Sequence, residues 1–281
     1  MTSAENAPMV LNARTALYGV FGDPVGHSLS PVMHNAAFRH AGVNGAYLAF
    51  RVADIRAAVD AVRALGIRGV SVTIPHKVSV MDHLDEIAPM AREIGAVNTL
   101  MNRDGRLVGY NSDSLGAVAA LSEKVNLRGK SVAVLGAGGA ARAVGVGVQA
   151  EGAKVTVVNR SVDRGERLAR DIGADFQTFD EFDPACSEVL VNTTPLGMAP
   201  NFNDTPISAE GVTPGTLVMD TVYNPRETRL LWEARQRGCV TVDGLAMFVN
   251  QGAFQFELWT GEKAPLAVMR AAVVAALGGG E

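Results

Sequence analysis

The stretch "KSVAVLGAGGAARAVGVGVQAEGAKVTVVNRS", residues 130–161, decides the fold prediction. An apolar run leads into a glycine-rich turn, a helical pattern follows, and a second apolar run closes the segment. The order strand, turn, helix, strand within about thirty residues has the size of one βαβ unit. A crossover of this kind joins parallel strands, so the stretch predicts a parallel sheet covered by helices.

The glycine-rich turn has the form G-x-G-G-x-A, with Ala141 at the third small position. The first glycine permits a tight turn, and the second lets the backbone approach a pyrophosphate. The helix that follows offers unpaired N–H groups and a positive dipole end to an anion. The turn predicts a dinucleotide site, and a plain tight turn is the alternative. The predicted contacts are Gly136, Ala137, Gly138, Gly139 and Ala140.

The end of the second strand, "VVNRSVDR", indicates which dinucleotide binds. An NAD enzyme usually carries an acidic residue there, which bonds the ribose 2′-hydroxyl. This sequence instead has Asn159 and Arg160, with Arg164 four residues later. A planar guanidinium suits a 2′-phosphate, so we predict NADP as the cofactor. The alternative is that both arginines are ordinary surface charges at a helix start.

The same alternation of short apolar runs and helical patterns extends in both directions. Before the glycine turn, strands are predicted at 16–22, 46–52 and 69–74 and helices at 31–41 and 53–66. After it, strands are predicted at 189–195, 216–223 and 239–244, and helices at 227–237, 246–259 and 265–277. The chain is therefore predicted to be α/β with largely parallel sheets. A domain change is predicted near Asp113, just before a helix at 114–124.

Composition limits the class of protein. The 281 residues are 48% hydrophobic, which suffices for a real core, and the net charge of -4 without a basic run argues against a nucleic-acid partner. Two cysteines, Cys186 and Cys239, are too few for a disulfide framework and suit a reducing, cytoplasmic setting. No apolar window is long enough for a membrane span. The first fourteen residues lack the features of a signal peptide and are predicted to be a loose polar tail.

The stretch "GHSLSPVMHN", residues 26–35, carries a possible anion site. Serine followed by proline at a helix start suggests that Ser30 is the N-cap and Pro31 the first helical residue. Ser28 adds a second hydroxyl beside the same helix end, next to the predicted end of the first strand. Two hydroxyls at a helix start can seat a small carboxylate. A purely structural cap is the alternative.

The stretch "SVTIPHK", residues 71–77, reads as a short strand followed by a lysine. One predicted face carries Val70, Val72 and Ile74, and the other carries Ser71 and Thr73. Pro75 ends the strand and Lys77 follows. By itself the pattern fits a half-exposed strand with a solvated lysine beyond it.

Taken together, the motifs resemble the shikimate dehydrogenase family. The stretches that carry the resemblance are "GVFGDPVGHSLSPVMHN", "SVTIPHK", "IGAVNTL", "GYNSD", "GAGGAAR", "VNRS", "NTTPLGM", "DTVYNPRETRLL" and "DGLAMFVNQGA". They follow the family's order from Tyr18 to about Trp259. The resemblance implies NADPH-dependent reduction of 3-dehydroshikimate to shikimate, in the pathway to aromatic amino acids. It also implies a discontinuous substrate domain, residues 1–112 and 246–281, and a Rossmann NADP-binding domain, residues 113–245.

The resemblance implies roles for particular residues. Lys77 and Asp113 match the pair that faces the substrate across the family's cleft. An ammonium within reach of the reacting carbonyl oxygen stabilises its charge and supplies a proton. The implied substrate contacts are Ser28 and Ser30 for the carboxylate, Thr73 and Asn98 for hydroxyls, and Tyr223 and Gln251. The residues implied on the nicotinamide side are Asn192, Thr193, Gly244 and Met247.

The stretch "NSDS" departs from the family's usual pattern at Ser112 and Ser114, which bears on the fit of the substrate. One alternative function is quinate/shikimate dehydrogenase, with NAD or with either cofactor. Others are a non-catalytic NADP-binding sensor and a dehydrogenase of another carbonyl substrate. A monomer or homodimer without a membrane or nucleic-acid partner is expected. The histidines match no metal-ligand spacing, so no metal is predicted and structural roles are expected for His27, His34 and His76.

Overall fold

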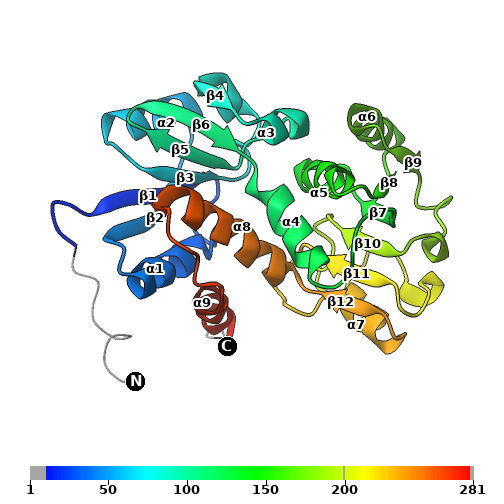
Figure 1. Cartoon of the computed structure of the whole chain (residues 1–281). Coiled ribbons are helices and arrows are strands. Elements are labelled where there is room, and N and C mark those ends of the chain that lie inside the picture. The colour runs from blue at the N-terminus through cyan, green and yellow to red at the C-terminus, as the bar shows by residue number, and fades with distance from the viewer. Residues whose placement is uncertain (1–10, 199, 279–281) are drawn as a thin grey trace. The chain divides into compact units, whose positions relative to one another are not determined.

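The structure is a computed structural model that describes residues 11–198 and 200–278. The chain divides into two units, each with a six-stranded sheet (Figure 1). The first unit extends to Ser112 and resumes at Gly252, and the second is Asp113–Gln251. Helix α8 (Gly244–Thr260) carries the chain from the second unit back into the first. The first unit is therefore discontinuous in sequence.

The prediction that the tail is loose up to about Arg14 was wrong for residues 12–14. Residues 1–10 of that tail lie outside the described residues. Asn12 and Thr15 form a turn in which the backbone N–H of Asn12 donates to Thr15 Oγ1 at 2.9 Å. The Thr15 hydroxyl also donates to Asn44 Oδ1 at 2.8 Å, which ties this turn to the body of the first unit. The segment before the first strand is thus held by side-chain hydrogen bonds.

The sheet of the first unit is mixed, with the strand order β2-β1-β3-β5-β6-β4. Strand β1 pairs in parallel with β2 and β3, and β4 pairs in parallel with β6, whereas β5 is antiparallel to β3 and β6. The strands are β1 (Ala16–Gly22), β2 (Gly45–Arg51), β3 (Gly69–Val72), β4 (Glu86–Ile87), β5 (Thr99–Arg103) and β6 (Arg106–Tyr110). The last three of these strands, β4, β5 and β6, were not predicted from the sequence.

Helices cover this sheet on both faces. They are α1 (Ser30–Ala41), α2 (Ile55–Ala64), α3 (Pro89–Ile94), α9 (Leu266–Gly278), the 3₁₀ helix η1 (Ser79–His83) and the end of α8. Figure 1 shows α1 and α9 side by side, so the last helix of the chain packs on the first. Asp54 caps α2 by accepting the N–H of Ala57 at 3.2 Å. The apolar stripe of α2 contributes Val59 and Val62 to the core.

Strand β3 is buried on both faces. Val70 and Val72 point into the apolar core with Val59 of α2, while Ser71 on the other face is only 7% exposed. The prediction that Ile74 shares the buried face was wrong, because β3 ends at Val72 and Ile74 is 72% exposed. The chain turns after Val72, where the N–H of His76 donates to Thr73 O at 2.9 Å, so the period of two no longer applies.

An aromatic cluster covers the other face of the first unit's sheet, opposite the side on which α2 packs. His34 of α1 stacks on Tyr47 of β2, with ring centroids 4.4 Å apart and planes at 11°. Trp259 of α8 lies 5.3 Å from His34 and donates its indole N–H to Leu100 O at 2.9 Å. Gly69 must be glycine, because a Cβ there would lie 2.3 Å from Trp259 Nε1. The end of α8 therefore packs directly on the sheet.

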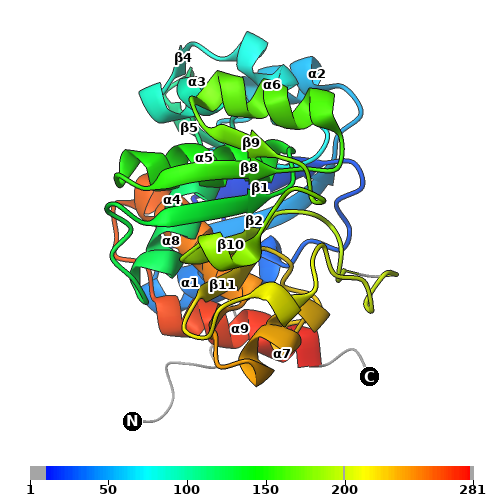
Figure 2. The same ribbon diagram turned by 90° about the vertical axis from the view of Figure 1, so that its right-hand side faces the viewer.

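The second unit has a fully parallel sheet with the order β12-β11-β10-β7-β8-β9. Figure 2 labels β9, β8, β10 and β11 in this order down the view, and β7 lies between β8 and β10. The strands are β7 (Ser131–Leu135), β8 (Lys154–Val158), β9 (Asp175–Gln177), β10 (Val189–Asn192), β11 (Leu217–Asp220) and β12 (Val240–Val242). Strands β10 and β11 are shorter than predicted, because residues 193–195 and 221–223 already form loops.

The sheet of the second unit is covered on both faces, as the pattern of a parallel sheet predicts. The helices are α4 (Ser112–Ser122), α5 (Gly139–Ala150), α6 (Val162–Ile172), α7 (Arg229–Gln236), α8, and the 3₁₀ helices η2 (Pro184–Cys186) and η3 (Ala209–Gly211). Alternate strand residues such as Val132 and Val134 pack against α4, α5 and α6. Their neighbours Ala133 and Leu135 pack on the opposite face with α7. This α/β arrangement agrees with the predicted fold class.

Candidate active site

The glycine turn lies where the strand order of the second unit reverses. Gly136 follows β7 and Thr193 follows β10, the strand on the other side of the switch point. Gly136 has φ +116°, and a Cβ there would lie 2.7 Å from Thr193 Oγ1. The Thr193 hydroxyl donates to Leu135 O at 2.7 Å, which holds the two strand ends together. Ligands of open α/β sheets bind at this position, so the switch point is the candidate dinucleotide site.

The N-terminus of α5 fits a pyrophosphate. Its N-cap residue is Gly138, and no side chain caps the first N–H groups. A Cβ at Gly138 or at Gly139 would meet no atom within 4 Å, so the space above the turn is open. Uncapped N–H groups and a positive dipole end face that space, as an anion requires. Ala137 and Ala140 of the same turn are half-buried.

The end of β8 presents the residues predicted to select the nucleotide. The Asn159 side chain donates to Ser161 O at 2.8 Å and thereby shapes the turn into α6. Arg160 follows it and is exposed, as is Arg164 in the first turn of α6. No acidic residue occupies the strand end. The arrangement leaves two guanidinium groups free to reach an anionic substituent.

Asn192 and Asp220 form a buried hydrogen-bonded pair at the ends of β10 and β11. The Asn192 amide donates to Asp220 Oδ1 at 3.0 Å, and its Oδ1 accepts the Thr194 hydroxyl at 2.7 Å. Neither Asn192 nor Asp220 exposes any surface. Burial raises the pKa of the Asp220 carboxyl. Asp220 was not predicted as a site residue, although a lone acid at the end of an apolar run was a signal for it.

Two of the residues implied on the nicotinamide side have internal contacts. A Cβ on Gly244 would lie 2.4 Å from Val222 O, so glycine is required where α8 begins against the chain after β11. Met247 packs in the core of the second unit and is 8% exposed. Their positions in α8 are therefore explained by packing, whatever they do for a ligand.

Tyr223 and Gln251 are the implied substrate contacts in the second unit. Tyr223 stacks on Phe248 of α8 with ring centroids 4.7 Å apart, and burial raises the pKa of its hydroxyl. The Gln251 amide donates to Phe248 O at 2.9 Å, one helical turn back. Asp113, the implied partner of Lys77, lies half-buried in the first turn of α4.

The serine pair in the first unit lies at the start of α1, but the predicted cap was wrong by one residue. Leu29 is the N-cap and Ser30 is already helical. Ser28 accepts the N–H of Ser30 at 3.3 Å, so it takes over the role of a capping oxygen. Ser30 is buried, with 6% of its surface exposed. Both serines remain at one helix start.

A buried polar cluster extends from this point through the first unit. Tyr47 donates to Ser71 Oγ at 2.7 Å, and Ser71 donates to Gln255 Oε1 at 2.8 Å. Burial raises the pKa of the Tyr47 hydroxyl. Ser71 is a polar residue on a buried strand, and its hydroxyl bonds two polar partners there, Tyr47 and Gln255. Neither Tyr47 nor Gln255 was predicted as a site residue, although Gln255 is one turn after Gln251 on a largely apolar helix.

Asn98 lies at the far end of this cluster. Its Oδ1 accepts the backbone N–H of Ser112 at 2.7 Å and the Thr99 hydroxyl at 2.8 Å. The N–H of Val97 donates to Lys77 O at 2.8 Å, so the backbone holds Lys77 next to Asn98. In the first unit, Lys77, Asn98 and Ser112, the residue before Asp113, therefore lie close together.

Thr73 packs closely under the end of β1. A Cβ on Gly22 would lie 2.4 Å from the Thr73 methyl, so the glycine makes room for it. The backbone N–H of Thr73 donates to Phe21 O at 2.9 Å. Lys77 follows four residues later and is half-buried. Thr73, Lys77 and Asn98 therefore all lie near the ends of β1 and β3.

The histidines and cysteines have varied surroundings. His34 is fully buried, and His76 is buried with Nε2 2.7 Å from Val52 O, whereas His27 is exposed. Cys239 is a buried free thiol and Cys186 an exposed one. The charge of Asp183 raises the pKa of Cys186 and burial raises that of Cys239. Across residues 11–198 and 200–278, no group of three or more potential ligand side chains could hold a metal ion.

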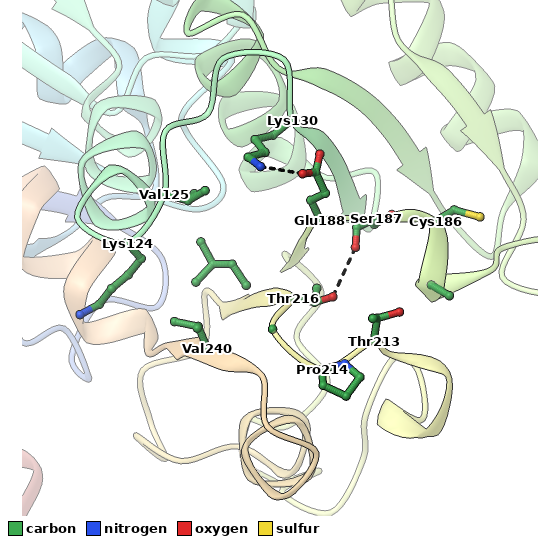
Figure 3. Close-up of a pocket in the computed structure, with 13 residues that line it drawn as sticks. Lys124, Val125, Lys130, Cys186, Ser187, Glu188, Thr213, Pro214, Thr216 and Val240 are labelled. Atoms are coloured by element: carbon green, nitrogen blue, oxygen red, sulfur yellow. Dashed lines mark hydrogen bonds and ion pairs between the residues drawn. The ribbon is translucent and has the colours of Figure 1, made fainter.

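A pocket of about 330 Å³ lies at the opposite end of the second unit's sheet (Figure 3). Its lining includes Glu188, which precedes β10, and the first residues of β11 and β12, Leu217 and Val240, away from the glycine turn. Figure 3 shows Lys130 directed at Glu188, which it contacts at 2.6 Å. The cation is thus already paired with a carboxylate, and the pocket is separate from the candidate dinucleotide site.

Comparison with known proteins identifies the family. The description "Shikimate dehydrogenase substrate binding domain" matches residues 20–100, "Shikimate / quinate 5-dehydrogenase" matches 118–194, and "Shikimate 5'-dehydrogenase C-terminal domain" matches 244–274. The chain is 48% identical to the shikimate dehydrogenase (NADP(+)) of Symbiobacterium thermophilum over 279 residues, which cover 94% of this chain and 95% of the relative. The chain belongs to the shikimate dehydrogenase family.

Solved structures of this family share the fold. A crystal structure of a shikimate dehydrogenase in complex with NADP⁺ is 39% identical, with a TM-score of 0.90, and the match covers 95% of this chain and 98% of that one. A quinate dehydrogenase from Corynebacterium glutamicum in complex with NAD is 30% identical, with a TM-score of 0.87 over 93% and 99% of the two chains. The shikimate dehydrogenase fold therefore serves more than one substrate. Within the described part of the chain, no helix is long and apolar enough to cross a membrane.

Proposed function

We propose that this chain is an NADP-dependent shikimate dehydrogenase, which reversibly reduces 3-dehydroshikimate to shikimate in aromatic amino acid biosynthesis. The observation that carries the proposal is the 48% identity, over nearly the full length of both chains, to a relative named for this activity and cofactor. The open glycine cradle and the arginine after β8 support it independently. We also propose that the first unit binds the substrate, that the second binds NADP, and that the enzyme is cytoplasmic.

The first unit supplies most of the proposed substrate contacts. Ser28 and Ser30 would bind the carboxylate at the start of α1, where the helix dipole favours an anion. Thr73 and Asn98 would bind ring hydroxyls. In the second unit, Tyr223 and Gln251 are proposed as further contacts. These residues orient the ring, which lowers the entropic part of the barrier.

Lys77 is the proposed proton donor. As the carbonyl becomes an alcohol, negative charge develops on its oxygen, and an ammonium within hydrogen-bond reach stabilises that charge and transfers a proton. Asp113 is proposed to bond a neighbouring hydroxyl and to orient the lysine. In the reverse direction the lysine, having lost its proton, accepts the proton of the substrate hydroxyl.

The second unit is proposed to hold NADP. The N–H groups at Gly138 and Gly139 would bind the pyrophosphate, and Arg160 and Arg164 the 2′-phosphate. Asn159, Thr193 and Asn192 shape the loops on either side. The bound dinucleotide supplies or receives the hydride. The chain's own residues would hold it and orient it.

The alternative is oxidation of quinate, with NAD or with either cofactor. The related quinate dehydrogenase in complex with NAD makes this a concrete possibility for the fold. Two features of this chain favour shikimate with NADP: both front serines are present, and an arginine rather than an acid follows β8. Ser112 and Ser114, which depart from the usual pattern, are the residues to alter first if quinate reacts well.

The deciding experiment measures initial rates of shikimate and quinate oxidation, each with NADP and with NAD, from the nicotinamide absorbance. A strong preference for shikimate with NADP supports the proposal. Comparable rates with quinate or NAD favour the alternative. If the folded protein binds NADP but oxidises neither substrate, the dehydrogenase assignment is wrong.

A further inference from the structure

Gln255 is the branch point of the buried cluster in the first unit. It is 1% exposed, and both ends of its amide are bonded. Oε1 accepts from Ser71 Oγ at 2.8 Å and lies 3.3 Å from His34 Nε2. Nε2 donates to Thr99 Oγ1 at 3.0 Å and to Ser112 Oγ at 3.1 Å. One side chain of α8 thus joins α1, β3, β5 and the start of α4.

The direction of these hydrogen bonds is fixed at one end by a backbone group. The N–H of Ser112, which can only donate, bonds the side chain of Asn98 at 2.7 Å, so the atom that it meets must be Oδ1. The Thr99 hydroxyl donates to the same oxygen at 2.8 Å, and the Ser112 hydroxyl lies 3.2 Å from it. The two hydroxyls are 3.0 Å apart, and with both directed at Asn98 Oδ1 they accept from Gln255, which presents Nε2 to them and Oε1 to the opposite side.

The orientation of the Gln255 amide also determines which groups donate and which accept at the other end of the cluster. Because Oε1 of Gln255 can only accept, Ser71 must donate to it and must accept from Tyr47, at 2.7 Å. His34 must likewise carry its proton on Nε2, and its Nδ1 has no partner among the described residues. Burial lowers the pKa of His34 to about 3, in keeping with a neutral ring. The donors of Tyr47, Ser71, Thr99 and Gln255 and the His34 Nε2 proton then each have an acceptor.

Asn98 is the member of the buried cluster that is proposed to contact the substrate. With its Oδ1 occupied by Ser112 and Thr99, its Nδ2 group is on the other branch of the amide and has no acceptor in the described part of the chain. We propose that Gln255 is a positioning residue: by donating to Thr99 it directs the Thr99 hydroxyl at Asn98 Oδ1, which reinforces the bond from the Ser112 N–H and holds Asn98 Nδ2 toward a hydroxyl oxygen of the substrate. This inference rests on the proposed function.

The test compares Gln255→Met with wild type in shikimate oxidation. Methionine keeps the length of the side chain and removes both hydrogen-bonding ends. Without them Thr99 is free to turn its hydroxyl away from Asn98 Oδ1, and the Asn98 amide keeps only its bonds from Ser112. We expect the KM for shikimate to rise about tenfold or more, the equivalent of one lost hydrogen bond. The KM for NADP and kcat should stay within about twofold, because Lys77 and the second unit are unchanged.

Asn102→Leu is the matched control. Asn102 is also a buried amide of the first unit, 8% exposed, but it bonds only backbone groups: it donates to Ile67 O at 2.9 Å and accepts from Gly105 N at 2.8 Å. Its loss should lower the thermal unfolding temperature as much as Gln255→Met does, without the rise in the KM for shikimate. A purely structural role of Gln255 predicts the same kinetic behaviour for both variants.

The outcomes separate the two proposals. If Gln255→Met is active with an unchanged KM for shikimate, the inference is wrong and the proposed function stands. If wild type oxidises no shikimate, the proposed function is wrong and the inference falls with it. If Gln255→Met does not fold, Thr99→Val takes its place, because valine keeps the shape of threonine and breaks the same connection. The same rise in KM is then required.

Discussion

The Thr228 hydroxyl donates a 2.7 Å hydrogen bond to Oδ2 of Asp220, a carboxylate with no exposed surface. Oδ1 of Asp220 accepts the amide of Asn192 and the backbone N–H of Val222, each at 3.0 Å. Three donors from three segments therefore converge on one buried acid. Since the cost of burial outweighs these bonds, the pKa of Asp220 is raised. The carboxylate ties together the loops beside the candidate dinucleotide site.

Asp220→Ala should destabilise the protein strongly. It leaves the Asn192 amide, the Thr228 hydroxyl and the Val222 N–H without their acceptor, and a buried unpaired donor costs about 1–3 kcal/mol. We expect the free energy of unfolding to fall by about 2–5 kcal/mol in urea denaturation. The exposed Asp180→Ala should change it by less than about 0.5 kcal/mol. Equal effects of the two variants would contradict the structural role of Asp220.

Gly138→Ala tests the glycine cradle. The backbone at Gly138, with φ −96° and ψ −171°, suits alanine, and the added methyl would meet no protein atom within 4 Å. Stability should therefore be unchanged, while the methyl occupies the space proposed for the pyrophosphate. We expect NADP affinity, measured by calorimetry, to fall about tenfold or more. Gly211→Ala, where only Pro184 is near, is the control. Unchanged NADP affinity in Gly138→Ala would place the pyrophosphate elsewhere.

Arg160→Gln should alter the choice of nucleotide. A charge-assisted hydrogen bond to a phosphate is worth about 1.5–3 kcal/mol, so the KM for NADP should rise about 10- to 100-fold. The KM for NAD, which lacks the 2′-phosphate, should hardly change. Arg167→Gln, an exposed arginine further along α6, should leave both values alone. A parallel rise in both values for Arg160→Gln would mean that the guanidinium does not read the 2′-phosphate.

Lys77→Ala should abolish most of the turnover. Positioned acid–base help is worth about 10²- to 10⁴-fold, and kcat for shikimate oxidation should fall by that factor. NADP binding, measured in the absence of substrate, should remain that of wild type. The exposed Lys124→Ala should keep full activity. Near-normal kcat in Lys77→Ala would remove the lysine from the chemistry.

His34 should make the protein less stable in acid. Burial lowers the pKa of His34 from 6.5 to about 3, so the unfolded chain binds a proton in this pH window and the folded chain does not. The contribution of His34 to stability is complete above pH 6.5 and is lost as the pH falls toward 3. The slope is about 1.4 kcal/mol per pH unit.

Urea denaturation at several pH values between 6.5 and 4 tests this dependence. His34→Gln should show a slope smaller by about 1.4 kcal/mol per pH unit, since glutamine does not titrate. His40→Gln, at an exposed position, should keep the wild-type slope. If His34→Gln and wild type lose stability in parallel, then the ring is not held neutral.

Much of the fold could be predicted from local sequence. The segment 130–161 contains the glycine turn and the hydrophobic patterns of two strands and a helix. It forms β7, α5 and β8 as predicted. The short strands β4, β5 and β6 were missed, because strands of two to five residues carry too little periodicity. Ile74 was misplaced because a tight turn, not the hydrophobic pattern, ends β3.

The sequence by itself determined the α/β alternation, the glycine turn, the absence of an acid after β8 and the family motifs, since each is a property of neighbouring residues. Only the tertiary structure decided which polar groups meet. Ser71 and Gln255 are 184 residues apart in sequence and bond at 2.8 Å, and Asn192 and Asp220 are 28 apart and bond at 3.0 Å. Such pairs leave no local pattern, because a buried hydrogen bond depends on how strands and helices pack and not on the spacing of residues along one element.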